Sequence, residues 1–246
     1  MSVLKRSEAI ILKGVKFGES SEILSIFTRE MGKIKAVAKG KRRPKSHLAA
    51  SLEPFKLSEI VFYFRPDLDL QLIKEAKVLR SFDGFREDYR KASLGFGIIK
   101  LLEHALPEHT PHEKVFQMTL KAFEILERSP SVAVHYAYKV KFLSFVGHRI
   151  ETDRCVVCRR RIEANQPVLY FSPRDFGPIC KTCYLRGEIH EAIEIGQNNI
   201  EEIKTLMWGH FYNIADLQIH DKTLEIIDKC VGEAFHIPIN GEIIKM

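Results

Sequence analysis

The sequence lacks any apolar run long enough to span a membrane. The apolar stretch 9–12, which follows Lys5 and Arg6, is also too short for a signal peptide. We therefore expect a cytoplasmic protein without membrane contact, and in that compartment cysteines stay reduced. Internal repeats and low-complexity segments are absent as well, and the apolar content of 45% is typical of an ordinary folded protein.

Motifs of catalysis are missing too. No GxxxxGK[ST] run is present to bind ATP, and neither a nucleophile elbow nor an HExxH motif occurs. The stretch 95–100 begins like a dinucleotide fingerprint, but it lacks the third glycine and falls in a helical pattern. The sequence therefore predicts a binding protein and not an enzyme.

Acidic residues are missing from residues 33–45, where seven basic residues stand. These are Lys33, Lys35, Lys39, Lys41, Arg42, Arg43 and Lys45. The first 80 residues hold 17 Lys and Arg against 9 Asp and Glu, whereas the remaining 166 hold 21 against 23. Such a density of positive charge favours a polyanionic partner, because its self-repulsion must be offset. A solvated basic face is the alternative.

The same segment alternates basic and apolar residues, which is the pattern of a strand. A strand would place Lys33, Lys35 and Lys39 on one face and the apolar residues between them on the other. The run then breaks into residues 40–46, whose glycine, proline and serine indicate a loop. A basic strand edge that continues into a basic loop is a suitable track for a phosphate backbone.

Short strands with turn signals account for the first 80 residues. We expect the strands at 8–15, 22–28, 33–38, 54–64 and 70–79. Turns are expected at 29–32 and 65–67. Five strands over this length predict an OB-fold barrel, a fold that binds single strands. Phe62 and Phe64 share one strand face and are expected in the core, which leaves Tyr63 as the candidate to stack on a base.

Beyond residue 80 the apolar period becomes helical. The helices are expected at 94–105, 111–126, 132–145, 200–214 and 224–235. We expect them to pack into one bundle that a cysteine module interrupts, with Cys230 as a small buried residue. The predicted class is therefore α+β: a five-stranded OB-fold barrel, then an α-helical bundle with an inserted ribbon. The predicted domains are 1–80 for the barrel, 81–150 and 188–246 for the helical domain, and 151–187 for the ribbon.

Two CxxC pairs form the strongest motif: Cys155, Cys158, Cys180 and Cys183. A two-residue spacer lets one tight turn aim two sulfur atoms at the same ion, and zinc takes four thiolates tetrahedrally. Because four thiolates fill the coordination sphere, the zinc would be structural. A redox CxxC is the alternative, but two copies at ribbon spacing favour metal. Solvated positions are favoured over nucleic-acid contacts for the nearby arginines: Arg159, Arg160, Arg161 and Arg174.

Several stretches of the first 80 residues resemble the N-terminus of the bacterial RecO family of recombination mediators. They are 9–13 (AIILK), 18–20 (GES), 27–33 (FTREMGK), 38–46 (AKGKRRPKS) and 52–55 (LEPF). The order of barrel, helices, four-cysteine zinc insert and helices is also that of the family. The family often has a Gly-Gly pair before its third cysteine. Here residues 175–179 keep one glycine, a difference that concerns the local turn and not the metal.

The resemblance implies a nucleoid-associated DNA repair protein that binds single- and double-stranded DNA and anneals complementary strands. It also implies RecR as a partner, contact with the C-terminal tail of the single-stranded-DNA-binding protein, and indirect help in loading RecA. Tyr63 is expected to stack on a base, and phosphate contacts are expected from Lys13, Lys16, Lys33, Lys35, Lys39, Lys41, Arg42, Arg43 and Lys45.

Two other classes of function stay open at this point. An RNA-binding or ribosome-associated factor would also use an OB barrel and a zinc ribbon. A metal-dependent enzyme acting on nucleic acid is the second alternative, and turnover of labelled DNA with magnesium or manganese would favour it.

Overall fold

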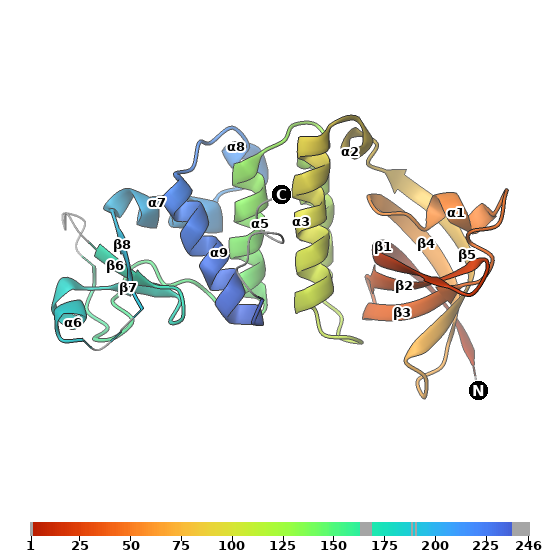
Figure 1. The fold of residues 1–246 in the computed structure, drawn as a ribbon, viewed down its shortest axis with the longest axis horizontal. Helices are drawn as coiled ribbons and strands as arrows, with labels where there is room; N and C mark the ends of the chain where they lie inside the picture. The colour runs from red at the N-terminus through yellow and green to blue at the C-terminus, as the bar shows by residue number, and fades with distance from the viewer. Residues whose placement is uncertain (1, 163–168, 188, 190, 238–246) are drawn as a thin grey trace. The chain divides into compact units, whose positions relative to one another are not determined.

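The computed structural model describes residues 2–162, 169–187, 189 and 191–237. The chain divides into two compact units, Met1–Arg128 and Ser129–Met246. In Figure 1 the strands of the first unit run from red to orange, and the helices of the second unit run from green to blue. Within the described ranges, no helix combines the length and the apolar character needed to cross a membrane.

Five strands of the first unit close into a barrel: β1 (Val3–Phe17), β2 (Ser21–Thr28), β3 (Gly32–Ala38), β4 (Lys56–Phe64) and β5 (Leu70–Ser81). Their order around the barrel is β1-β2-β3-β5-β4, and every neighbouring pair is antiparallel except β3 and β5. This is the five-stranded arrangement of the OB fold. The predicted α+β class and its barrel are therefore confirmed, and each expected strand overlaps an observed one.

Alternating apolar side chains fill the barrel, because successive residues of a strand point to opposite faces. They include Ala9, Ile11, Leu24, Ile26, Ile34, Ala36, Ile60, Phe62 and Ile73. Helix α1 (His47–Ser51) adds Leu48, and Leu52 follows it into the same core. Strand β1 is buried at residues 9–12 and exposed at residues 13–17.

Helices α2 (Gly84–Glu87), α3 (Tyr89–Ala105) and α4 (Glu113–Leu126) complete the first unit. Phe116 of α4 meets Phe27 of β2 edge to face, with ring centroids 5.3 Å apart. Glycine is required at position 95 of α3, because a Cβ there would lie 2.6 Å from the Phe55 ring. The first glycine of the apparent dinucleotide fingerprint therefore serves close packing. Helix α4 begins two residues later than predicted, at Glu113.

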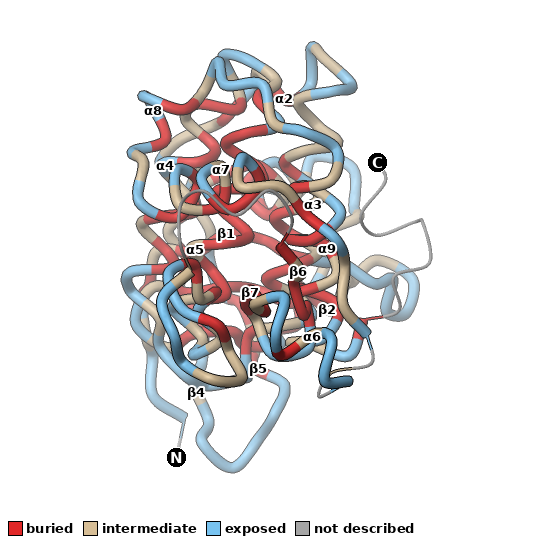
Figure 2. Tube along the Cα trace, turned by 90° about the vertical axis from the view of Figure 1, so that its left-hand side faces the viewer, coloured by how far each residue is buried: buried red, intermediate tan, exposed pale blue. Residues whose placement is uncertain are grey.

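The helices of the second unit are α5 (Val132–Phe145), α7 (Gln197–Trp208), α8 (Phe211–Ile214) and α9 (Asp221–Phe235). Helix α5 packs against the other three and is buried nearly all round, as the red colour in Figure 2 shows. The predicted helix 200–214 is interrupted at Gly209, whose extended backbone ends α7. A Cβ on Gly209 would lie 2.6 Å from the Thr205 carbonyl oxygen, so glycine suits this break. Cys230 is fully buried, as expected.

The cysteine module stands between α5 and α7 in the chain. It contains β6 (Leu169–Ser172), β7 (Gly177–Ile179), α6 (Lys181–Leu185) and β8 (Ile193–Ile195). The three strands form an antiparallel sheet in the order β7-β6-β8. The inserted four-cysteine module is thus present, whereas the domain boundaries at 80, 150 and 187 and the single helical bundle stay predictions.

Candidate metal and nucleic-acid sites

The four cysteines of the two CxxC pairs come together in the second unit. Their sulfur atoms all lie within 4.8 Å of one another, and Sγ of Cys158 is 3.8 Å from Sγ of Cys180. Four sulfur atoms placed tetrahedrally at about 2.3 Å from a zinc ion would stand about 3.8 Å apart. The cysteines are therefore positioned to bind a metal ion, and the two-residue spacers predicted this.

Two tight turns present these sulfur atoms. The Arg159 amide donates to the Cys155 carbonyl at 2.9 Å and closes the first turn. In the second, Cys180 caps α6, whose first turn carries Cys183. The Cys180 amide also donates to Sγ of Cys155 at 3.4 Å. Such amide donors stabilise negative charge on sulfur, which a thiolate ligand requires.

The fold of the module shifts the pKa values of two of these thiols in opposite directions. A hydrogen bond from the Arg160 backbone lowers the pKa of Cys158 to about 7. Burial raises the pKa of Cys183 to about 12, so a bound cation would have to displace that proton.

Most of the apolar residues packed around the cysteines are only partly buried. Among the described residues, the buried cluster of the module consists of Cys155, Ile179 and Cys183. Tyr170 and Tyr184 stack beside it, with their ring planes 10° apart. A core this small supplies little folding free energy, and in such a module a bound metal ion would add to the stability.

Lys33 does not lie on an open face of the barrel. Lys33 is only 8% exposed, and its amine donates to the carbonyl oxygen of Glu103. The segment between α3 and α4 covers it. The His109 amide donates to the Lys33 carbonyl at 2.9 Å, and the Thr110 carbonyl oxygen lies so close to Gly32 that a Cβ there would be 2.0 Å from it. Lys33, which the sequence assigned to a phosphate contact, is therefore covered by Glu103 and by the segment between α3 and α4, and its contact with a phosphate stays a prediction.

Lys35 is half-exposed but engaged by a carboxylate. Its Nζ lies 2.6 Å from Oε1 of Glu108, and this hydrogen bond raises the pKa of Lys35 and lowers that of Glu108. In the ladders Lys13 and Lys35 flank Ser25, which donates to the Glu103 carboxylate. Two carboxylates thus accompany the two lysines of this row, which reduces its attraction for phosphate.

Arg42 holds the basic loop against the β1–β2 hairpin. Its guanidinium donates to the carbonyl oxygens of Gly18 at 2.6 Å and Glu19 at 2.7 Å. Its own amide donates to the Ser20 carbonyl at 2.9 Å. These bonds order residues 40–43 and use donors of Arg42 that the sequence assigned to phosphates.

Lys41 is also engaged within the barrel. Its Nζ lies 2.7 Å from Oε2 of Glu22, and the two side chains are only 13% and 17% exposed. Glu22 stands directly between Lys16 and Ala38 in the strand ladders. The pair therefore fixes the start of the loop to the end of the hairpin.

Five of the predicted cations remain exposed and, within the described residues, have no carboxylate partner: Lys13, Lys16, Lys39, Arg43 and Lys45. Phe17, which follows Lys16 at the end of β1, is 50% exposed. We call these six residues the hairpin–loop surface. It combines unpaired positive charge with one exposed aromatic ring, the two features that single-stranded nucleic acid binds.

Tyr63 belongs to an apolar row that circles the outside of the barrel. Direct ladder partners follow one another across all five strands: Val15, Ile23, Val37, Leu72, Tyr63 and Leu4. Tyr63 is 38% exposed, and Leu4 and Val15 are each about half-exposed. Sequence reasoning identified only Tyr63 in this row. Apolar residues at outward strand positions are the signal that indicates the others.

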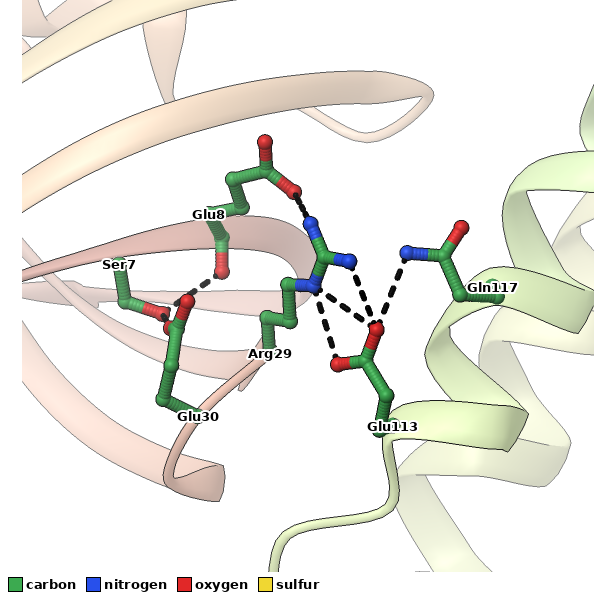
Figure 3. A network of polar contacts seen from close by, with 6 residues as sticks. All are labelled: Ser7, Glu8, Arg29, Glu30, Glu113 and Gln117. Carbon is green, nitrogen blue, oxygen red and sulfur yellow. Dashed lines mark hydrogen bonds and ion pairs between the residues drawn. The ribbon is translucent and has the colours of Figure 1, made fainter.

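Arg29 is a structural residue that the sequence did not reveal. Figure 3 shows its guanidinium between Glu8 of β1 and Glu113 of α4. Nη1 lies 2.9 Å from Glu8, Nη2 lies 2.7 Å from Glu113, and Gln117 also donates to the Glu113 carboxylate. The hydrogen bond raises the pKa of Arg29 and lowers that of Glu113. This network ties the start of α4 to the barrel.

Comparisons with known proteins point to one family. A family model described as Recombination protein O N terminal matches residues 1–82, and one described as Recombination protein O C terminal matches residues 86–206. A curated protein of Rubrobacter xylanophilus named DNA repair protein RecO is 32% identical, over 73% of this chain and 71% of its own length. Proteins of the same name from Thermoanaerobacter sp. and Rhodopirellula baltica are 26% and 32% identical, and the matches cover 90% and 65% of their lengths.

Proposed function

The chain belongs to the RecO family of DNA repair proteins, and on that basis we propose that it is a DNA-binding recombination mediator. In this proposal it binds single- and double-stranded DNA and anneals complementary strands. With RecR it helps to load RecA onto strands coated by the single-stranded-DNA-binding protein. It acts in the nucleoid without catalysing a covalent reaction.

The hairpin–loop surface is the observation that carries this proposal. Its exposed cations can exchange counterions for phosphates, and this exchange supplies most of the sequence-independent affinity for DNA. Lys41 and Arg42 order the loop that carries Arg43 and Lys45, so fewer backbone conformations are lost when DNA binds. Annealing then needs no fuel, because neutralised phosphates let base pairing provide the driving force.

We propose zinc as the metal of the four-cysteine site. Four thiolate ligands at tetrahedral spacing suit this ion, and they leave no open position for water or substrate. Bound zinc would hold the two turns together and so stabilise the module. Cys155, Cys158, Cys180 and Cys183 would be its ligands.

The expected partners rest on family membership. We propose RecR and the C-terminal tail of the single-stranded-DNA-binding protein as direct partners, with RecA affected indirectly. An acidic tail that ends in apolar residues would need an apolar groove with a basic rim.

A strand-annealing assay tests the proposal directly. Complementary strands coated with the single-stranded-DNA-binding protein are mixed with the full chain or with the double variant Arg43→Glu, Lys45→Glu. The variant should bind single strands about tenfold more weakly and anneal correspondingly more slowly, because two phosphate contacts become repulsions. The matched control is Lys114→Glu, Lys121→Glu, which reverses two exposed charges on α4 of the same unit.

If both double variants lost affinity and annealing rate to the same extent, a localised DNA surface would be contradicted. Competition between single-stranded DNA and structured RNA separates the proposal from an RNA-binding function. A large preference for RNA would replace the proposed function with the RNA-binding alternative.

A further inference from the structure

Trp208 has an unusual setting for the single tryptophan of the chain. It is the last residue of α7 and is 64% exposed. The guanidinium carbon of Arg149 lies 4.8 Å from the centre of its ring system. With Arg149 over one face and most of the residue in solvent, the indole still offers a broad π-surface. Bases stack on rings and guanidinium planes of this kind.

Two contacts join this pair to the cysteine module. Lys204, one turn before Trp208 on α7, pairs with Asp153 at 3.2 Å. Asp153 follows Arg149 by four residues, so this segment runs along the α7 face that carries Trp208. Arg154 comes next, and its guanidinium donates to the Arg159 carbonyl at 3.3 Å. The first cysteine turn therefore continues the surface that begins at Trp208.

Three consecutive arginines complete this surface: Arg159, Arg160 and Arg161. All three are exposed, and within the described ranges their guanidinium groups have neither a hydrogen-bond partner nor a carboxylate partner. They do not neutralise the sulfur cluster by direct contact, because only the backbone of Arg160 bonds to Cys158. Positive charge is thus available to an external anion.

Arg159 stands where glycine would fit more easily. Its φ of +62° lies in the left-handed region, which disfavours residues with a Cβ. The chain keeps a long cationic side chain there in spite of this strain. Strain of this kind is a reason to look for a function of the side chain.

We propose that Trp208, Arg149 and the three arginines 159–161 form a second binding surface for single-stranded DNA, in the C-terminal unit. The indole stacks on an unpaired base, and the arginines contact the phosphates that follow. This inference rests on the proposed function and extends DNA binding from the basic N-terminal segment to the C-terminal unit. An acidic peptide would match the charge but would leave the flat π-surface without a base.

The single tryptophan makes the test direct. Intrinsic emission of the full, metal-loaded chain is measured during titration with oligothymidylate and with an abasic oligonucleotide of equal length. Fluorescence anisotropy of labelled DNA reports binding in parallel. Oligothymidylate should quench Trp208 in proportion to the bound fraction, whereas the abasic strand should bind without that quenching, because only a base can stack.

The outcomes separate this inference from the proposed function. Binding of oligothymidylate by anisotropy with unchanged tryptophan emission would overturn the second surface and leave the hairpin–loop surface standing. Absence of binding in both measurements would overturn both proposals. Quenching by an acidic peptide but not by oligothymidylate would assign the surface to a peptide and overturn the inference.

Two variants provide an independent check. Trp208→Ala should weaken oligothymidylate binding about tenfold, the loss expected for one stacked base. Arg159→Gly removes a charge while relieving the left-handed backbone, so it should keep its metal and its melting temperature. Its affinity should fall about threefold at 0.2 M salt, and the slope of log K against log salt should decrease in magnitude by about 0.7.

Lys222→Gln is the matched control, because it removes a partly exposed cation from α9 of the same unit. It should bind like the parent chain. Parent-like binding by Trp208→Ala and Arg159→Gly as well would overturn the second surface.

Discussion

The amine of Lys41 lies 2.7 Å from the carboxylate of Glu22, and both side chains are largely buried in the barrel unit. One lysine of the most basic segment is therefore neutralised by the protein itself. Arg42 is similarly engaged by carbonyl oxygens of the hairpin. The basic segment thus contains two consecutive residues that order the loop, Lys41 and Arg42, and exposed cations before and after them.

Glu22→Gln should separate these two roles. The variant loses a partly buried ion pair, so the free energy of unfolding should fall by about 1 kcal/mol in urea titrations. Lys41 gains freedom to meet a phosphate, so affinity for single-stranded DNA should rise a few-fold by anisotropy. A drop in affinity would mean that ordering the loop matters more than the additional charge.

Binding of single-stranded DNA should depend steeply on salt. The five exposed cations of the hairpin–loop surface alone contribute a slope of log K against log salt of about −3.5, which is roughly a hundredfold loss between 50 and 200 mM. Anisotropy titrations at four salt concentrations measure this slope. A nearly flat dependence would show that phosphates are not the main contacts.

The network at Arg29 predicts a pH-dependent stability. The pKa of Glu113 is lowered in the folded chain, so its contribution is present above the pKa of the unfolded chain. That contribution is lost as the pH falls through the lowered folded value. The melting temperature of Glu113→Gln should therefore lie below that of the parent chain at pH 6, and the difference should shrink toward pH 3. A difference that stays constant over this range would exclude a role for the charge.

Metal removal should expose a definite set of thiols. In the metal-loaded chain the four clustered cysteines are coordinated and Cys230 is buried, so a thiol reagent should react with almost none of them. A strong chelator should release the four, and only denaturation should release Cys230. Cys183→Ser should lose metal and lower the melting temperature. Fast reaction of all five thiols before chelation would contradict a coordinated site.

A buried ion pair in the second unit should be costly to break. Nζ of Lys139 and the hydroxyl of Tyr136 each lie 2.7 Å from the Asp228 carboxylate. Asp228→Asn leaves the lysine charge buried without its partner, so the free energy of unfolding should fall by about 3 to 5 kcal/mol. The double variant Lys139→Met, Asp228→Leu should recover much of that loss. An equally large loss in the double variant would point to packing as the cause.

Local patterns account for what the sequence predicted correctly. The alternation of apolar residues indicated the barrel strands, the helix 132–145 was predicted with its observed bounds, and the CxxC spacers indicated the metal site. One difference arises where a distant segment intervenes, and the other has a local cause. Segment 103–110 covers Lys33, and the Thr205 carbonyl at Gly209 accompanies a break in a helix expected to continue.

The chain by itself determined the elements, the sulfur ligands and the concentration of positive charge in its first third, because these depend on neighbours a few residues apart. Only the tertiary structure decided which cations are free. Lys33, Lys35 and Lys41 each meet a carbonyl or carboxylate group of another element. Within the described residues, Lys39 and Lys45 have no such partner, and Arg43 meets the Ser20 hydroxyl. The pairing of Trp208 with Arg149 was decided in the same way. A cation is available to a phosphate where the fold leaves it exposed and brings no carboxylate to it.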